Sequence, residues 1–517
     1  MMTSSAALAS SRMKTVDATM TSKKTIYSEV LFDYQKLAAE RIAKQRSILL
    51  ADQPGLGKTL EVLSALELAD LYRIGMNILI ITPIINAQTA WIDSIKRFVE
   101  PRYDVNVLDI SKGSVHDKRA LLEENLQGLC NIVVANHNAI DWMVNSHRVS
   151  SLTMASFDAV VIDESHMVLP ILNHRKKTKF WEGLQNIRMK DDCMRVAVSG
   201  TPDRGKLDNR YGTWLFLEPA TTPRNRWDWL AQNFHMYEQK VSRSHTVKMV
   251  GALKDKNTWI ERDKEMMIRR TKNEVLQELP PKRYIDVEVT LEGMQYKDYG
   301  LLRQEAMKPA TNKGAAMEPM VFATRARQIA NCQWDNDWEP RVGGKSAKLD
   351  WLLEWLDTRG YADMSLDGKV VIVSQFSKVL HWLKAELSDK KIHSEILDGA
   401  TKNRDDIQRR FQEDPELRIV LLSGQMGVGI TLDAADDLIM FDSPYDPDRI
   451  EQIEDRIHRA SNMHNVTIWN LIAKATIDQI IVGKVSKRYK VTRQMLDGAR
   501  GVNFEREIMQ KLSVGAK

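Results

Sequence analysis

Short apolar runs alternate with stretches of helical periodicity along most of the chain, beginning at about Leu31. Each run is rich in β-branched residues, is bounded by polar or turn residues, and precedes a segment that can form a helix. This rhythm is typical of parallel sheets with helices on both faces. The predicted strands fall at 47–52, 77–83, 131–137, 159–164 and 195–202 in the first half, and at 369–376, 393–397, 418–424, 437–442 and 466–472 in the second.

The pattern predicts an α/β protein with two tandem, doubly wound parallel-sheet lobes. Between about Tyr211 and Trp338 the rhythm stops, and this region is expected to be mainly helical, including the window "DWLAQNFHMYEQKV" at 228–241. The predicted organisation is a disordered tail over 1–25, lobe one over 26–210, helical insertions and linker over 211–340 that include the end of lobe one near 267–290, lobe two over 341–482, and a basic tail over 483–517.

Composition narrows the class of protein only a little. The chain has 517 residues and a formal net charge of +5, which is compatible with a nucleic-acid partner without requiring one. Its three cysteines lie far apart, which argues against a disulfide framework or a zinc site and favours a reducing compartment. No apolar run is long enough to span a membrane. We therefore expect a cytoplasmic protein, and its small size would suit a bacterium or the cytosol of a virus-infected host.

The stretch "ADQPGLGKTLEV" at 51–62 indicates a phosphate-binding loop, although Asp52 stands where the general pattern has glycine. Gly55 and Gly57 allow the backbone to turn so that several N–H groups point into one space. Lys58 can reach the β- and γ-phosphates, and the hydroxyl of Thr59 can hold Mg²⁺. These features predict a nucleoside triphosphate as ligand.

An acidic motif further along the chain supports that prediction. The apolar run in "FDAVVIDESH" delivers Asp163 and Glu164 to the carboxyl end of a strand, where ligands bind in open α/β sheets. Asp163 would hold Mg²⁺ through water, and Glu164 would polarise the attacking water as general base. A lone Asp-Glu pair after a strand can also cap the next helix, but the loop about a hundred residues upstream favours hydrolysis.

Taken in order, these motifs resemble the Swi/Snf-related branch of helicase superfamily two, ATP-driven double-stranded-DNA translocases with two RecA-like lobes. In that family Ala-Asp also precedes the loop, so the missing glycine is a family habit. The resemblance rests on "LFDYQ", "ADQPGLGKT", "DESH", "SGTP" (199–202), "MIRRTKNEVLQELPPK" (267–282), "VSQF", "LLSGQMGVGITLDAADDLIMFD" and "QIEDRIHRA".

The resemblance implies a nucleotide site shared by both lobes. Gln452, Arg456 and Arg459 are spaced i, i+4 and i+7, which places them along one face of a predicted helix. The two arginines would act as fingers that stabilise charge on the γ-phosphate. An exposed, salt-bridged helix is the alternative for this segment. The implied nucleotide-binding residues are Gln35, which would read the adenine, Gly55, Leu56, Gly57, Lys58, Thr59, Gly429 and Gln452.

The resemblance also implies contacts to the nucleic-acid backbone at the carboxyl ends of strands. A translocase must ignore base sequence, so short polar side chains and backbone N–H groups suit this task. The implied contacts are Thr82, Pro83, Asn136, Ser374, Gln375, Ser423 and Gln425. The basic runs at 173–179 and 484–490 could add charge or simply form solvated faces.

The sequence departs from the family pattern at Thr431, at 203–205 and at 460–462, which concerns the coupling of hydrolysis to movement. We expect an ATP- and Mg²⁺-dependent motor that acts as a monomer on double-stranded or branched DNA. Sliding, remodelling, branch migration and strand annealing all use such an engine. An ATP-gated DNA-binding clamp with weak hydrolysis and an RNA-directed ATPase remain open alternatives.

Overall fold

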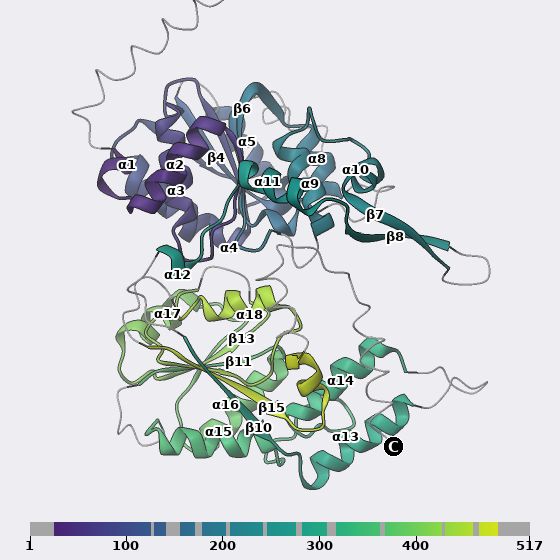
Figure 1. Ribbon diagram of the computed structural model, residues 1–517. Coiled ribbons are helices and arrows are strands. Elements are labelled where there is room, and N and C mark those ends of the chain that lie inside the picture. Colours follow the sequence, from purple (N-terminus) through teal and green to yellow (C-terminus); the bar gives the residue numbers. More distant parts are fainter. Residues whose placement is uncertain are drawn as a thin grey trace, which may run out of the picture.

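Two parallel sheets, one in each half of the chain, organise the molecule (Figure 1). In Figure 1, lobe one runs from purple to teal and lies above lobe two, which runs from teal through green to yellow. The predicted α/β fold with two tandem RecA-like lobes is confirmed. The computed structural model describes residues 25–125, 129–140, 156–170, 178–202, 207–240, 246–275, 282–307, 317–361, 368–426, 430–458 and 465–483.

The sheet of lobe one has seven strands in the order β3-β4-β2-β5-β6-β1-β9, and all neighbouring strands are parallel. Ile78 and Ile80 pack into one core, whereas Leu79 and Ile81 pack into another on the opposite face. Because both faces are buried, these strands read as continuous apolar runs. The strands are β1 (Ser47–Leu50), β2 (Asn77–Thr82), β3 (Val105–Asp109), β4 (Cys130–Asn136), β5 (Ser156–Ile162), β6 (Arg188–Val198) and β9 (Met267–Ile268).

Helices cover both faces of this sheet. Ala38 and Leu66, from α2 and α3, belong to one core, while Trp214 and Trp229, from α9 and α10, belong to the other. The helical segments are α1 (Ile26–Glu29), α2 (Asp33–Gln45), α3 (Lys58–Leu68), α4 (Ile84–Asn86), the π-helical η1 (Ala87–Ile92) and η2 (Ile95–Val99), α5 (Val115–Asn125), the 3₁₀-helical η3 (Ser165–Met167) and η4 (Leu207–Asn209), α8 (Lys179–Gln185), α9 (Arg210–Leu217), α10 (Arg226–Asn233), α11 (Lys256–Met266) and α12 (Lys272–Val275).

The sheet of lobe two has six parallel strands in the order β10-β15-β14-β11-β13-β12. Its strands are β10 (Arg283–Val289), β11 (Val370–Ser374), β12 (Glu395–Leu397), β13 (Ile419–Ser423), β14 (Asp437–Met440) and β15 (Thr467–Ala473). Its helices are α13 (Gly293–Ala306), α14 (Pro319–Asn331), α15 (Ala347–Thr358), α16 (Ser377–Asp389), α17 (Arg404–Glu413) and α18 (Pro447–Glu454).

The helix predicted over 228–241 is wrong in its second half. Helix α10 ends at Asn233, and β7 (Phe234–Lys240) pairs antiparallel with β8 (Thr246–Leu253). Phe234 and Met236 pack against the core of lobe one, whereas His235 between them and Tyr237 beyond them are exposed. This alternation has the period of a strand, not of a helix. Figure 1 shows the β7–β8 hairpin extending outward from lobe one.

A second correction concerns the boundary between the lobes. The segment near 267–290 was expected to end lobe one, but it divides between the two sheets. Strand β9 pairs with β1 in lobe one, whereas β10 pairs with β15 in lobe two. The tails predicted over 1–25 and 483–517 lie outside the described residues, except for Thr25 and Gly483. Within the described ranges, no helix is long and apolar enough to cross a bilayer.

Candidate functional site

The phosphate-binding loop connects β1 to α3 and has the geometry that its glycines predict. Gly55 and Gly57 adopt positive φ angles of 87° and 82°, which favour glycine. Gly57 is the residue directly before α3, and a Cβ at this position would overlap the side-chain amide of Gln35. The loop therefore leads into the positive end of a helix, which is suited to binding phosphate.

Two side chains at the start of α3 complete the loop. The ammonium of Lys58 donates to the carbonyl oxygens of Asp52 at 2.8 Å and Gln53 at 3.3 Å. Thr59 follows in the first turn of α3 and is half-buried. The Lys58 side chain thus folds back over the phosphate-binding loop.

Gln35 supports the loop from helix α2. Its Nε2 donates to the carbonyl of Leu56 at 2.9 Å, and its Oε1 accepts from the backbone N–H of Phe32 at 3.0 Å. The side chain is buried, so it holds Leu56 and Gly57 in place from behind. Its expected contact with the adenine stays a prediction.

Asp163 lies at the carboxyl end of β5 and is held by four donors. Its Oδ2 accepts from the hydroxyl of Thr82 at 2.9 Å, Nδ2 of Asn86 at 3.2 Å and Nε1 of Trp91 at 3.0 Å. Its Oδ1 accepts from the N–H of Glu164 at 2.9 Å. A carboxylate with most of its lone pairs engaged suits an outer contact to a hydrated Mg²⁺, which usually keeps several waters. The binding of Mg²⁺ by Thr59 and Asp163 stays a prediction.

Glu164 has the left-handed conformation, with φ 46° and ψ 44°. For a residue with a Cβ this conformation costs about 1–3 kcal/mol and is concentrated at functional sites. The turn directs Glu164 toward His166, whose Nδ1 lies 3.3 Å from the carboxylate and 2.9 Å from the hydroxyl of Ser199. The acidic motif and the "SGTP" motif are thereby joined through one imidazole.

Asp52, the residue that replaces glycine, anchors a distant segment. Its fully buried carboxylate accepts from the backbone N–H of Arg270 at 2.8 Å and also pairs with the Arg270 guanidinium. The same guanidinium lies 2.6 Å from Oε1 of Glu61 in α3 and stacks on Tyr34 at 5.0 Å from the ring centre. Burial, and next the charge of Asp52, raise the pKa of Glu61 to about 8.

Lobe two reaches the loop through α18 and the turn after it. Nε2 of Gln53 donates to Oε1 of Glu451 at 2.6 Å, and Lys272 forms an ion pair with Asp455 at 2.7 Å. Burial, and next the charge of Asp455, raise the pKa of Glu451. These contacts bring residues about 200 to 400 positions apart in sequence to one place.

The single helix predicted to carry Gln452, Arg456 and Arg459 is too long. Helix α18 ends at Glu454, and Arg456 lies in the turn that follows, with its Nη2 donating to the carbonyl of Met426 at 2.7 Å. Ile453 and Ile457 are buried in a core of lobe two and anchor the end of α18 and this turn there. Gln452 is half-buried on α18, and Arg459 and Gly429 lie outside the described residues.

The expected nucleic-acid contacts of lobe one lie at the carboxyl edge of its sheet, but two of them face inward. Thr82 is fully buried against Asp163, and Asn136 is buried, with its Oδ1 accepting from the N–H of Ala139 at 2.6 Å. Pro83 is half-buried directly before α4. The predicted contacts of these three residues with nucleic acid stay predictions.

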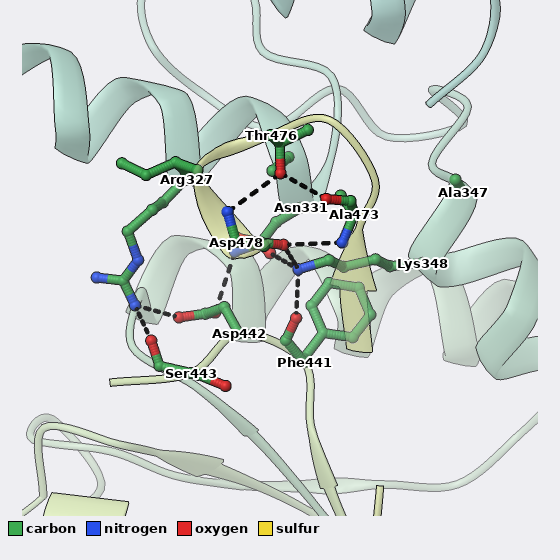
Figure 2. Close-up of polar contacts among 12 residues, drawn as sticks. Arg327, Asn331, Ala347, Lys348, Phe441, Asp442, Ser443, Ala473, Thr476 and Asp478 are labelled. Atoms are coloured by element: carbon green, nitrogen blue, oxygen red, sulfur yellow. Dashed lines mark hydrogen bonds and ion pairs between the residues drawn. The ribbon is translucent and has the colours of Figure 1, made fainter. Parts of the chain in front are cut away.

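In lobe two, Asp442 organises the corresponding edge. Its carboxylate accepts from the hydroxyl of Ser374 at 2.5 Å and from Arg327 and Asn331 of α14, each at 3.0 Å. Figure 2 shows this cluster continuing to Lys348, whose ammonium lies 2.7 Å from both Asp478 and the carbonyl of Phe441. The buried charges are thus paired, as burial demands.

Gln375 follows Ser374 at this edge, and its backbone N–H donates to Asp442. Its Nε2 is buried and has no hydrogen-bond partner in the described part of the chain. A Cβ on Gly424 would overlap this amide, so the turn after β13 approaches it closely. Ser423 is buried with its hydroxyl accepting from the N–H of Gln425 at 3.2 Å, and Gln425 is exposed.

Sequence reasoning missed several residues of the site. Asn86 and Trp91 donate hydrogen bonds to Asp163, and no motif in the sequence pointed to them. Arg270 and Lys272 stand in the "IRRTK" run, which signalled the family but not a contact with the loop. Only the position of that run beside β1 reveals its role.

The fold and this site define a class of protein: a two-lobed nucleoside triphosphatase. Comparisons with known proteins specify the family. The SNF2-related domain matches residues 19–334, and the helicase conserved C-terminal domain matches residues 347–461. The chain therefore belongs to the SNF2-related family of helicase superfamily two, and it is an ATP hydrolase.

Individual relatives are distant. An uncharacterized ATP-dependent helicase of Mycoplasma genitalium is 24% identical over 465 residues, which cover 88% of this chain and 40% of that protein. The DNA annealing helicase and endonuclease ZRANB3 of Mus musculus is 24% identical over 472 residues, covering 87% of this chain and 39% of that protein. The chain thus spans about two fifths of the length of these relatives. The Sulfolobus solfataricus SWI2/SNF2 ATPase core in complex with dsDNA is 20% identical, with 93% of this chain and 94% of that chain covered and a TM-score of 0.37.

Proposed function

We propose that this protein is a DNA-dependent ATPase that translocates along double-stranded or branched DNA. The observation that carries the proposal is the bonding of the phosphate-binding region to lobe two. Gln53 of the loop bonds to Glu451, and Lys272, in the segment between the sheets, pairs with Asp455. Because the loop itself touches lobe two, a change in the separation of the lobes alters the surroundings of the phosphates. Such closure and opening are how motors of this type link chemistry to movement.

The hydrolytic roles follow from the residues around the loop. Lys58 would neutralise the β- and γ-phosphates, and Glu164 would orient the attacking water. Mg²⁺, held by Thr59 and through water by Asp163, would stabilise the charge on the phosphates. Arg456 would leave the carbonyl of Met426 and, with Arg459, stabilise charge on the γ-phosphate.

The grip on DNA would come from the carboxyl edges of both sheets. A motor that passes every sequence binds the phosphate backbone, and short polar groups suffice for that contact. The amide Nε2 of Gln375 is buried and has no hydrogen-bond partner among the described residues, so it is a donor that a phosphate oxygen could satisfy. A relative described as a DNA annealing helicase supports duplex or branched DNA as the substrate.

Nucleic-acid stimulation of ATP hydrolysis tests this function. We expect duplex DNA to raise the turnover of the purified protein at least about tenfold above its basal rate, a modest acceleration for an enzyme, and more than single-stranded DNA or RNA does. Lys58→Ala should abolish turnover with every stimulator. Stimulation by RNA alone would establish the RNA-directed ATPase instead, and tight duplex binding without stimulation would establish the clamp.

A further inference from the structure

Lys272 occupies an unusual position between the two lobes. It begins α12, in the segment that joins the sheets, and its side chain is only 5% exposed. Its ammonium donates to Oδ1 of Asp455 at 2.7 Å and to the carbonyl of His458 at 2.5 Å, both in lobe two. Its backbone N–H donates to Oε1 of Gln53 at 2.7 Å, which ties it to the phosphate-binding loop as well.

The side chain also lies directly against the loop. A Cβ built on Gly55 would be 3.3 Å from Cε and 3.4 Å from Nζ of Lys272. Lys58, the first residue of α3, also folds over this loop. Two ammonium groups therefore border the place where the loop is built to bind phosphates, and Gly55 allows the closer approach because it has no side chain.

A buried lysine requires a negative partner. Asp455 supplies one carboxylate, at hydrogen-bond distance. A triphosphate in the loop would bring several further negative charges next to Nζ, and lysine is a common phosphate ligand that acts as a point charge. The ammonium has three hydrogens, but a phosphate oxygen in the loop and Asp455 in lobe two compete for the same charge.

We propose that Lys272 is a further phosphate-binding residue of the ATP site, and that Asp455 is a carboxylate latch that competes with the triphosphate for it. The proposal rests on ATP binding at the Lys58 loop and is independent of the DNA partner. The two interactions are reciprocal. The ion pair with Asp455 weakens the binding of Lys272 to phosphate, and phosphate binding weakens the ion pair. Nucleotide binding thereby weakens the ion pair between the segment that joins the sheets and lobe two.

A latch and a merely structural ion pair predict opposite changes in nucleotide affinity when Asp455 is replaced. The affinity for the fluorescent probe N-methylanthraniloyl-ADP is measured without DNA, together with the melting temperature of each variant. For Asp455→Asn we expect tighter binding, by about fivefold, and for Lys272→Met weaker binding, by about tenfold, both within the usual range of coupling between sites. Asp455 also pairs with Lys282 at 3.5 Å. The double variant should bind like Lys272→Met, because the latch requires Asp455 to act on the nucleotide through Lys272. Asp455→Ser repeats the test if the asparagine variant does not fold.

Glu454→Gln is the matched control. Glu454 precedes Asp455, pairs with Lys282 at 2.9 Å and accepts a hydrogen bond from the hydroxyl of Tyr284. Its affinity for the probe should stay within about twofold of wild type, well below the coupling expected for a latch. Weaker binding in both Asp455→Asn and Lys272→Met, or no change in either, would overturn the latch. Undiminished turnover in Lys58→Ala would instead overturn the ATP site itself.

Discussion

Asp52 explains why the phosphate-binding loop departs from the general pattern. Its φ is not positive, so the position has no need of glycine, and its carboxylate is fully buried against Arg270. The sequence alone marks Asp52 as an anomaly that the family shares. It could not reveal the partner, because Arg270 lies 218 residues away and the two meet only when β9 joins β1.

Replacing Asp52 with the glycine of the general pattern should therefore lower the stability of the protein. Asp52→Gly leaves the half of the Arg270 guanidinium that faces it without a partner, and we expect a loss of about 3 kcal/mol in the free energy of unfolding, the low end for a broken buried pair because Glu61 remains. Urea denaturation followed by tryptophan fluorescence measures it. Asp52→Asn, which keeps an acceptor, is the matched control and should lose less. A stability for Asp52→Gly within about 1 kcal/mol of wild type would show that the pair is unimportant.

At the scale of elements, what could be predicted depended on burial. The strands in the middle of both sheets are covered on two faces, so they consist of continuous apolar runs and could be predicted from the sequence. Strand β3 is half-buried along most of its length, β10 mostly alternates half-buried and exposed residues, and β9 has two residues, so none gave a continuous apolar run. The end of α18 was missed for another reason: the apolar stripe of Ile453 and Ile457 continues past the last helical residue into a turn.

Contacts between motifs were also beyond the sequence. "SGTP" contributes to the family resemblance, but its closeness to the phosphate-binding loop appears only in the structure. A Cβ on Gly200 would lie 2.8 Å from Cγ and 2.9 Å from Cδ of Pro54, a ring that cannot move aside. Arg269 reinforces the junction by donating to the carbonyls of Ala51 and Gly200, each at 3.3 Å. Glycine at position 200 thus allows two loops to pack together.

Gly200→Ala should separate these loops. We expect turnover to fall about tenfold, and the free energy of unfolding to fall by about 1–3 kcal/mol, as for other overpacked sites. Steady-state ATPase assays and urea denaturation measure the two effects. Gly300→Ala is the control: this helical glycine has nothing within 4 Å of an added Cβ, so the change should stabilise the protein by up to about 1 kcal/mol. Equal behaviour of the two alanine variants would contradict the proposed junction.

At the scale of the whole molecule, one segment joins the two sheets. Strand β9 ends lobe one at Ile268, and β10 begins lobe two at Arg283. Between them lie Arg269, Arg270 and Lys272, which bind the phosphate-binding loop, while Lys272 also binds lobe two. A motor needs its two halves to respond to one nucleotide, and this connection offers a direct route. It is the physical basis for proposing movement as well as hydrolysis.

Displacement of the third strand from a DNA triplex measures that movement most directly. The triplex lies at one end of a long duplex, and release of the third strand reports arrival of the motor without strand separation. We expect the wild-type protein to release it with ATP and Lys58→Ala to release none. ATP hydrolysis that duplex DNA stimulates without any release of the third strand would contradict translocation and leave a DNA-activated clamp.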